Sequence, residues 1–275
     1  KEFEVTFDQK TGTLTTFDFK NKKLVESGPE VNFWRAPVDN DYGAGTQKRY
    51  KAWKDAGKSE KVTTAVKQLS KSEVQISFTR DLFGGDAKLI ETFIVDGNGA
   101  VKVTNELKAL KGKHPDFFKF GNKLVLPEAY KNITFYGKGP FEAYADRQHA
   151  AKVGLYKQTI AEQYFPYIRP QETGNKLEVR WVTLTKEDGS GIKFLSENPL
   201  SVSALNFRED DLHSGDEKGQ HHAGEIDPRK EVFVNIDGFQ QGLGSINSWG
   251  MLPLEQYRLP YKDYSYSYWM IPFEK

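Results

Sequence analysis

Three carboxylates stand where the chain could perform acid–base chemistry. Glu142, Asp146 and Glu172 lie in segments rich in glycine and aromatic residues, beside Arg147 and Arg169. Glycosidic bonds are cleaved by two carboxyl groups, about 5 Å apart when configuration is retained and wider when it is inverted. A neighbouring cation tunes a carboxyl pKa, but it makes a structural ion pair just as readily. With 38 Asp and Glu residues in the chain, sequence proximity alone does not assign a catalytic pair.

The histidines and the remaining acidic residues do not form a metal-binding motif. The five histidines include no HExxH sequence and no pair spaced i, i+4, and adjacent His221 and His222 would face opposite sides of a strand. Asp39, Asn40 and Asp41 resemble the start of a calcium loop, but Tyr50 stands where the twelfth, acidic ligand belongs. The chain has no cysteine, which excludes disulfides and thiolate ligands. We therefore predict no metal site in this chain.

Residues 242–249 form a candidate ligand loop. Gly242-Leu243-Gly244 lacks the third glycine and the strand-to-helix setting of a dinucleotide site, so it predicts a tight bend and no nucleotide cofactor. No GxSxG sequence is present, so a serine nucleophile elbow is excluded. Trp249 ends a loop of mostly small and polar residues, which offers few neighbours to bury an indole. Its expected use is apolar contact with the ring of a ligand.

Composition limits the partners of this chain. Its 39 Lys and Arg residues nearly balance the 38 acidic ones, and a net charge of +1 gives no field that would attract nucleic acid or an anionic membrane. No segment approaches the ~20 apolar residues of a membrane-spanning helix. The chain begins at Lys1 without an initiator Met or a signal sequence, so we expect its native amino terminus to lie upstream. The sequence leaves localisation open between cytoplasm and periplasm.

The elements that must position these residues are strands. Alternating apolar residues bounded by turn sequences predict hairpins, for example around Asp96-Gly97-Asn98-Gly99. The predicted strands are residues 3–7, 14–19, 73–79, 87–95, 101–107, 117–126, 132–136, 177–185, 192–196, 201–207, 231–237 and 264–272. One helix is predicted over residues 46–56, and residues 210–230 read as a long loop. The whole chain, 1–275, is therefore predicted to be a single all-β domain, a large antiparallel sandwich.

Four segments carry a family resemblance. Residues 32–43 read NFWRAPVDNDYG, residues 136–147 read YGKGPFEAYADR, residues 170–181 read PQETGNKLEVRW, and residues 237–250 read DGFQQGLGSINSWG. In this order they resemble the signatures of the carboxy-terminal domain of family 2 glycoside hydrolases of the β-galactosidase type. The resemblance implies a supersandwich similar to galactose mutarotase. It also implies a longer parent chain whose TIM barrel holds both catalytic glutamates, so no catalytic residue is expected here.

The resemblance also suggests roles for individual residues. Trp249 would contact the sugar from the rim of the active site, with Asn247 and Ser248 as its loop neighbours. Many relatives have Gly-Asp-Asp where this chain has Ser245-Ile246-Asn247, which removes two negative charges from the loop. The remaining signature residues are expected to build hydrogen-bonded loops rather than to bind sugar. They are Arg35, Asp39, Asn40, Asp41, Glu142 and Arg147.

The expected function is to complete the active-site rim of a retaining β-galactosidase that acts on terminal β-galactosides such as lactose. The TIM-barrel domain of the same chain is the expected partner, the parent is a candidate homo-oligomer, and any Mg²⁺ and Na⁺ or K⁺ would be bound elsewhere in it. Two alternatives remain open. An aldose 1-epimerase would need a histidine and a glutamate that converge in the sandwich groove, and a free-standing carbohydrate-binding module would need a platform of exposed aromatic residues.

Overall fold

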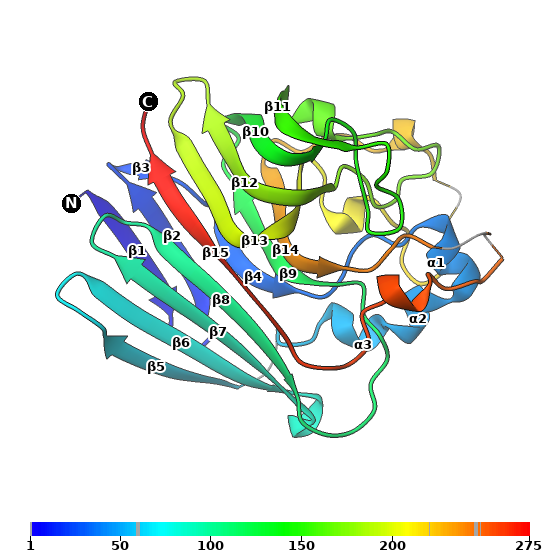
Figure 1. Cartoon of the computed structure of the whole chain (residues 1–275), viewed down its shortest axis with the longest axis horizontal. Coiled ribbons are helices and arrows are strands. Elements are labelled where there is room, and N and C mark those ends of the chain that lie inside the picture. Colours follow the sequence, from blue (N-terminus) through cyan, green and yellow to red (C-terminus); the bar gives the residue numbers. More distant parts are fainter. Residues whose placement is uncertain (1, 59–60, 220, 245–246, 248) are drawn as a thin grey trace.

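Short alternating segments joined by turn residues form antiparallel strands along the whole chain (Figure 1). The computed structural model describes residues 2–58, 61–219, 221–244, 247 and 249–275, and these contain fifteen β-strands and three short α-helices. The strands are β1 (Phe3–Asp8), β2 (Thr13–Phe19), β3 (Lys22–Lys23), β4 (Ser27–Asn32), β5 (Val62–Gln68), β6 (Glu73–Leu82), β7 (Ala87–Asp96), β8 (Val101–Ala109), β9 (Lys119–Leu126), β10 (Tyr130–Gly139), β11 (Lys152–Thr159), β12 (Lys176–Lys186), β13 (Gly191–Leu205), β14 (Val232–Gln240) and β15 (Tyr264–Phe273).

The strands form one small and one large sheet. β1, β2 and β3 make the small sheet, and the large one runs β11-β10-β12-β13-β15-β8-β7-β6-β5 with a branch β14-β9-β4. Strand β13 joins the two parts, because its residues 191–195 pair with β15 whereas its residues 201–205 pair with β14. One long strand therefore passes from one layer into the other, and the sheet curls around a shared core (Figure 1).

The core between the two layers is aromatic and carries one polar bridge. Phe93, Val103 and Tyr268 from the β15-β8-β7 side lie in the same buried cluster as Leu124 and Ile236 from the branch.

Asn122 of β9 links the two layers through side-chain hydrogen bonds within this core. Its Oδ1 accepts hydrogen bonds from Asn105 Nδ2 at 2.6 Å, Tyr266 Oη at 2.9 Å and Tyr268 Oη at 3.0 Å. These bonds give a partner to the buried hydroxyls of Tyr266 and Tyr268, which would otherwise be costly to bury, and they link the two layers.

The helical region differs from its prediction. The single helix expected over residues 46–56 is replaced by α1 (Asp39–Ala44), α2 (Thr46–Arg49) and α3 (Lys51–Lys54). Gly45 adopts a left-handed conformation with φ of 68°, which breaks the helix between α1 and α2. The apolar side chain that ties this region to the core is Trp53, which is fully buried.

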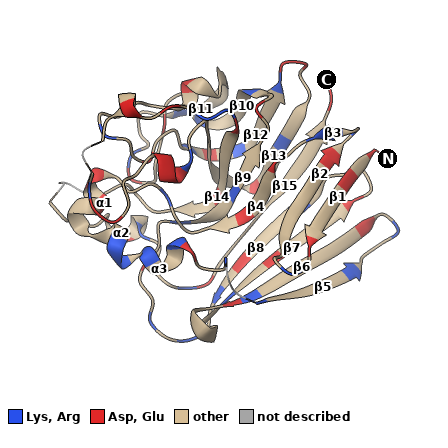
Figure 2. Cartoon of the chain, turned by 180° about the vertical axis from the view of Figure 1, so that it is seen from behind, with Lys and Arg blue, Asp and Glu red and all other residues tan. Residues whose placement is uncertain are grey.

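The predicted all-β antiparallel architecture is confirmed, and every predicted strand overlaps an observed one. The strands predicted separately at 192–196 and 201–207 are one continuous strand, β13, so that division was wrong. Strands β3, β4, β5 and β11 were not predicted. Figure 2 shows acidic and basic residues interspersed over strands and loops. In the described part of the chain, no helix is long and apolar enough to span a bilayer.

Candidate functional site

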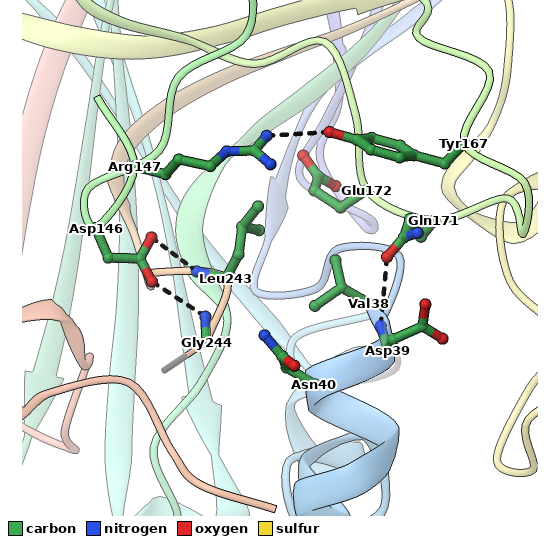
Figure 3. A pocket seen from close by; sticks show the side chains of 10 residues that line it. All are labelled: Val38, Asp39, Asn40, Asp146, Arg147, Tyr167, Gln171, Glu172, Leu243 and Gly244. Atoms are coloured by element: carbon green, nitrogen blue, oxygen red, sulfur yellow. Dashed lines mark hydrogen bonds between the residues drawn. The ribbon is translucent and has the colours of Figure 1, made fainter. Parts of the chain in front are cut away.

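Loops from all four signature segments meet at one cavity beside α1 (Figure 3). The cavity has a volume of about 410 Å³ and lies where the segments after β10, before β12 and after β14 approach the start of α1. Its lining residues are Val38, Asp39, Asn40, Asp146, Arg147, Tyr167, Gln171, Glu172, Leu243 and Gly244. The sequence indicated most of these residues one motif at a time, and the fold brings them together.

Arg35 and Asp41 form the buried support beneath this site. Arg35 Nη1 donates to Asp41 Oδ2 at 2.6 Å and Nη2 donates to Oδ1 at 3.2 Å, and both side chains are buried. Asp41 also accepts the backbone N–H of Val38 at 2.8 Å and the hydroxyl of Thr46 at 3.1 Å. Arg35 further donates to the carbonyl of Gly242 at 3.4 Å. The pair therefore ties α1 to the first residue of the loop that carries Trp249.

Asp146 holds the same loop from the other side. Its carboxylate accepts the backbone N–H groups of Leu243 at 3.0 Å and Gly244 at 3.1 Å (Figure 3). This approach requires glycine at position 242, because a Cβ there would lie 2.6 Å from Asp146 Cγ. Both carboxylate oxygens of Asp146 are thus occupied by the loop backbone, which makes it an anchor for the loop.

Glu142 and Arg147 form a second anchored group at the cavity edge. Glu142 accepts hydrogen bonds from Arg147, from the Tyr167 hydroxyl, from Thr173 Oγ1 at 3.0 Å and from the backbone N–H of Gly174 at 2.8 Å. Burial, together with the bond to Glu142, raises the pKa of Tyr167. With four donors around it, Glu142 has its acceptor capacity largely filled and locks the loop after β10 to the segment before β12.

Asp39 and Asn40 line the more open side of the cavity. Asp39 pairs with Arg169 Nε at 2.9 Å and with Lys218 Nζ at 2.7 Å. Burial alone would raise the pKa of Asp39, but the hydrogen bonds from Lys218 and Arg169 outweigh it and lower the pKa. Gln171 accepts the backbone N–H of Asp39 at 3.3 Å (Figure 3). The side chain of Asn40 packs against Gly244 at the base of the loop.

Glu172 is the carboxyl group in this cavity with the strongest perturbation. It is 7% exposed, and burial raises its pKa to about 7 despite the opposing charges of Lys119 and Arg35. Gln240 Nε2 donates to its Oε1 at 3.3 Å. A carboxyl group that titrates near neutral pH can exchange protons or hydrogen-bond to a hydroxyl in either protonation state.

Trp249 projects from the anchored loop into solvent, with 91% of its surface exposed. Its backbone N–H donates to Asn247 Oδ1 at 3.0 Å. Ser248, like Ser245 and Ile246, lies outside the described residues. Other large apolar side chains are exposed on the loops that surround the cavity. They are Phe141, Phe165, Ile168, Met251 and Leu254.

Neither a histidine nor a metal-ligand set belongs to the described lining of this cavity. His114 pairs with Asp86 at 2.9 Å and His213 with Asp210 at 3.1 Å, both away from the lining residues. Among the described residues, no group of three or more His, Asp or Glu could hold a metal ion. Tyr167, which no motif singled out, is a lining residue that the sequence reasoning missed, and only its place before the segment at 170–181 could have pointed to it.

Comparisons with known proteins identify relatives of this chain by sequence and by fold. The family model described as the β-galactosidase small chain matches residues 1–270. The chain is 31% identical over 265 residues to a β-galactosidase of Priestia megaterium and 32% identical over 263 residues to one of Bifidobacterium adolescentis. These matches cover 96% and 94% of this chain but only 25% and 24% of the relatives.

Among solved structures, the fold is similar to those of aldose epimerases. A putative aldose 1-epimerase from Escherichia coli K12 has a TM-score of 0.53 at 8% identity, covering 100% of this chain and 97% of that one. A galactose 1-epimerase from Lactobacillus acidophilus has a TM-score of 0.51 at 9% identity, covering 99% and 92%. At such low identity the likeness concerns the fold alone, and it confirms the expected mutarotase-like architecture.

Proposed function

Because the chain belongs to the β-galactosidase small chain family, we propose that it is the terminal domain of a longer β-galactosidase whose catalytic carboxylates lie outside it. The chain spans about a quarter of the length of the relatives it matches, which leaves ample room for a separate catalytic domain. The parent would hydrolyse terminal β-galactosides such as lactose by double displacement, with two glutamates of a TIM barrel as nucleophile and acid/base. Mg²⁺ and Na⁺ or K⁺, where the parent uses them, would be held in that other part, and the assembled enzyme is a candidate homo-oligomer.

The exposed indole of Trp249 is the observation that carries the proposed role of this chain. Exposing an indole to water has a free-energy cost, yet the loop that presents it is held at its base by Asp146 and Arg35. This arrangement suits a side chain that meets its partner only in the assembled enzyme. Trp249 would then form one wall of the galactoside site, with Asn247 shaping the loop.

The apolar side chains around Trp249 support a contact with the catalytic domain. Phe141, Phe165, Ile168, Met251 and Leu254 are each more than half exposed, and all belong to loops near the cavity. A surface rich in large exposed apolar groups is typical of an interface between domains or proteins. The TIM-barrel domain of the parent is the partner we propose for it.

The isolated chain is expected to show no β-galactosidase activity, because the proposed nucleophile and proton donor are absent from it. Incubation with nitrophenyl β-galactoside should give no release of nitrophenol above buffer, whereas the parent enzyme should turn over under the same conditions. Turnover that co-purifies with the chain in an independent preparation would refute the proposed division of labour.

Replacing Trp249 with alanine is expected to leave the free energy of unfolding within about 1 kcal/mol, because the indole packs against little of the fold. In the parent enzyme the same change should raise KM for galactosides, and a fall in kcat would indicate contacts that strengthen in the transition state. Trp53→Ala is the matched control, since loss of that fully buried indole should cost roughly 3–5 kcal/mol. Unchanged kinetics of the Trp249→Ala parent would rule out the rim role.

A further inference from the structure

A second cavity, which shares only Glu172 with the lining of the first, lies on the outer face of the branch β13-β14-β9-β4. Its volume is about 280 Å³. The strand register arranges its floor in two parallel rows, because residues two apart on a strand face the same side. The polar row is Ser203, Asn235, Lys123 and Glu30. The apolar row is Leu205, Phe233 and Val125, and it ends at Ser27.

The walls repeat this combination of apolar and polar surface. Phe207 and Leu212, from the segment after β13, are buried in one cluster with Leu205 and add to the apolar side. Glu209 and Glu172 stand on the polar side. A cavity with one apolar face and several convergent polar groups is the usual form of a small-molecule site.

Glu172 and Glu209 each keep acceptor capacity for a ligand. Gln240 donates to Oε1 of Glu172, whereas among the described residues no hydrogen bond reaches its Oε2. Glu209 receives Asn32 Nδ2 at 2.7 Å and Lys119 Nζ at 3.1 Å, both on Oε1. Glu172 as a residue is 7% exposed, but its Oε2 is not one of the enclosed atoms that lack a partner, so this oxygen stays accessible from the cavity. A ligand hydroxyl could donate to it there.

The charges of the lining decide the class of ligand. Four acidic residues, Glu30, Glu172, Glu209 and Asp210, stand against two basic ones, Lys123 and Arg208. This balance disfavours phosphorylated or carboxylated ligands. Hydroxyl groups, in contrast, donate to carboxylates while the C–H face of a ring packs on apolar side chains such as Phe233. We propose that this cavity is a second sugar site that binds a neutral monosaccharide, with the apolar row against the C–H face of the ring and Glu172 and Glu209 as hydroxyl acceptors.

The experiment titrates the isotopically labelled chain with D-galactose and follows backbone amide shifts by NMR. Millimolar affinity is expected, about −4 kcal/mol, with shifts at residues 123–125, 203–205 and 233–235. Shifts confined to residues 242–250, or none, would overturn the proposal. So would tighter binding of putrescine or inorganic phosphate, used as cationic and anionic probes, because the site would then select charge.

Two variants separate this site from the Trp249 loop. Phe233→Ala should weaken galactose binding by roughly fivefold to tenfold, since it removes the largest side chain of the apolar row. Trp249→Ala should leave these amide shifts unchanged. The two proposals are therefore independent: either the second sugar site or the rim role of Trp249 can be refuted while the other stands. If Phe233→Ala is unfolded by circular dichroism, the amide shifts of the wild-type chain decide alone.

Discussion

Replacing Asp41 with alanine is expected to lower the free energy of unfolding by about 3–5 kcal/mol, because the change leaves the charge of Arg35 buried without its partner. The bidentate pair is fully enclosed, and Asp41 also accepts from the Val38 backbone and the Thr46 hydroxyl. Truncating Asp41 to alanine removes only a carboxyl group, so the buried charge of Arg35 left without a partner, rather than lost packing, accounts for the effect. Urea denaturation at neutral pH measures it directly.

An exposed ion pair of similar length provides the control. Asp216 lies 2.5 Å from Lys51 Nζ, and both side chains are about half exposed to water. Asp216→Ala should therefore cost no more than about 1 kcal/mol. If the two substitutions lowered the free energy of unfolding equally, burial would not be the reason that the Arg35–Asp41 pair stabilises the fold.

The Arg35–Asp41 pair illustrates what the sequence could and could not predict about the site. The motif at 32–43 identified both residues, and their expected structural use stays a prediction that the Asp41 variant tests. Their contact is local, six residues apart, but the bond from Arg35 to the Gly242 carbonyl joins residues 207 apart. Spacing along the chain carries no information about such a contact. The convergence of Asp146, Tyr167 and Gly244 on one cavity was beyond sequence reasoning for the same reason.

The strands that were missed all lie at sheet edges. β5 and β11 are the two outer strands of the large sheet, β4 ends its branch, where it pairs with β9 alone, and β3 is an edge of the small sheet. Edge strands bury less of their surface and often carry charged or proline residues, so their apolar alternation is weak. β11 has mostly exposed or half-buried residues, and β4 contains Pro29. Inner strands such as β7 and β8 alternate over most of their length because one face packs on the core while the other stays partly exposed, and these were predicted.

Buried titratable groups next to the site could not be predicted from composition. Lys119 lies within 3.1 Å of Glu209 and 3.5 Å of Asp237, and Glu172 interacts electrostatically with the same lysine. Burial raises the pKa of Asp237 to about 7, with Lys119 opposing the shift and the neighbouring carboxylates adding to it. Burial is also the main cause that raises the pKa of Glu172 to about 7. Three carboxylates around one buried lysine cannot all ionise without cost.

The stability of the chain is expected to fall as pH rises from about 5 to about 7.5. Asp237 and Glu172 have pKa values near 7 in the folded chain but near 4 when unfolded, so between these values the folded state binds more protons. Each such proton gives a loss of up to about 1.4 kcal/mol per pH unit, and we expect at least about 2 kcal/mol in total. Lys176, whose pKa is lowered to about 8, changes stability only at higher pH. Urea midpoints measured across this range test the expected slope.

Asp237→Asn should reduce the slope by roughly half, because it removes one titrating group while Lys119 keeps Glu209 as its partner. Asp188→Asn is the matched control. The pKa of Asp188 is lowered, chiefly by hydrogen bonds from Ser190, so its titration lies below this pH range and the slope should not change. A wild-type stability that is flat or rises between these pH values would contradict the assignment, as would an unchanged slope in Asp237→Asn. Because Asp237 lies beside the wall formed by Glu209, the same variant would also show whether sugar binding in the second cavity depends on the protonation of this cluster.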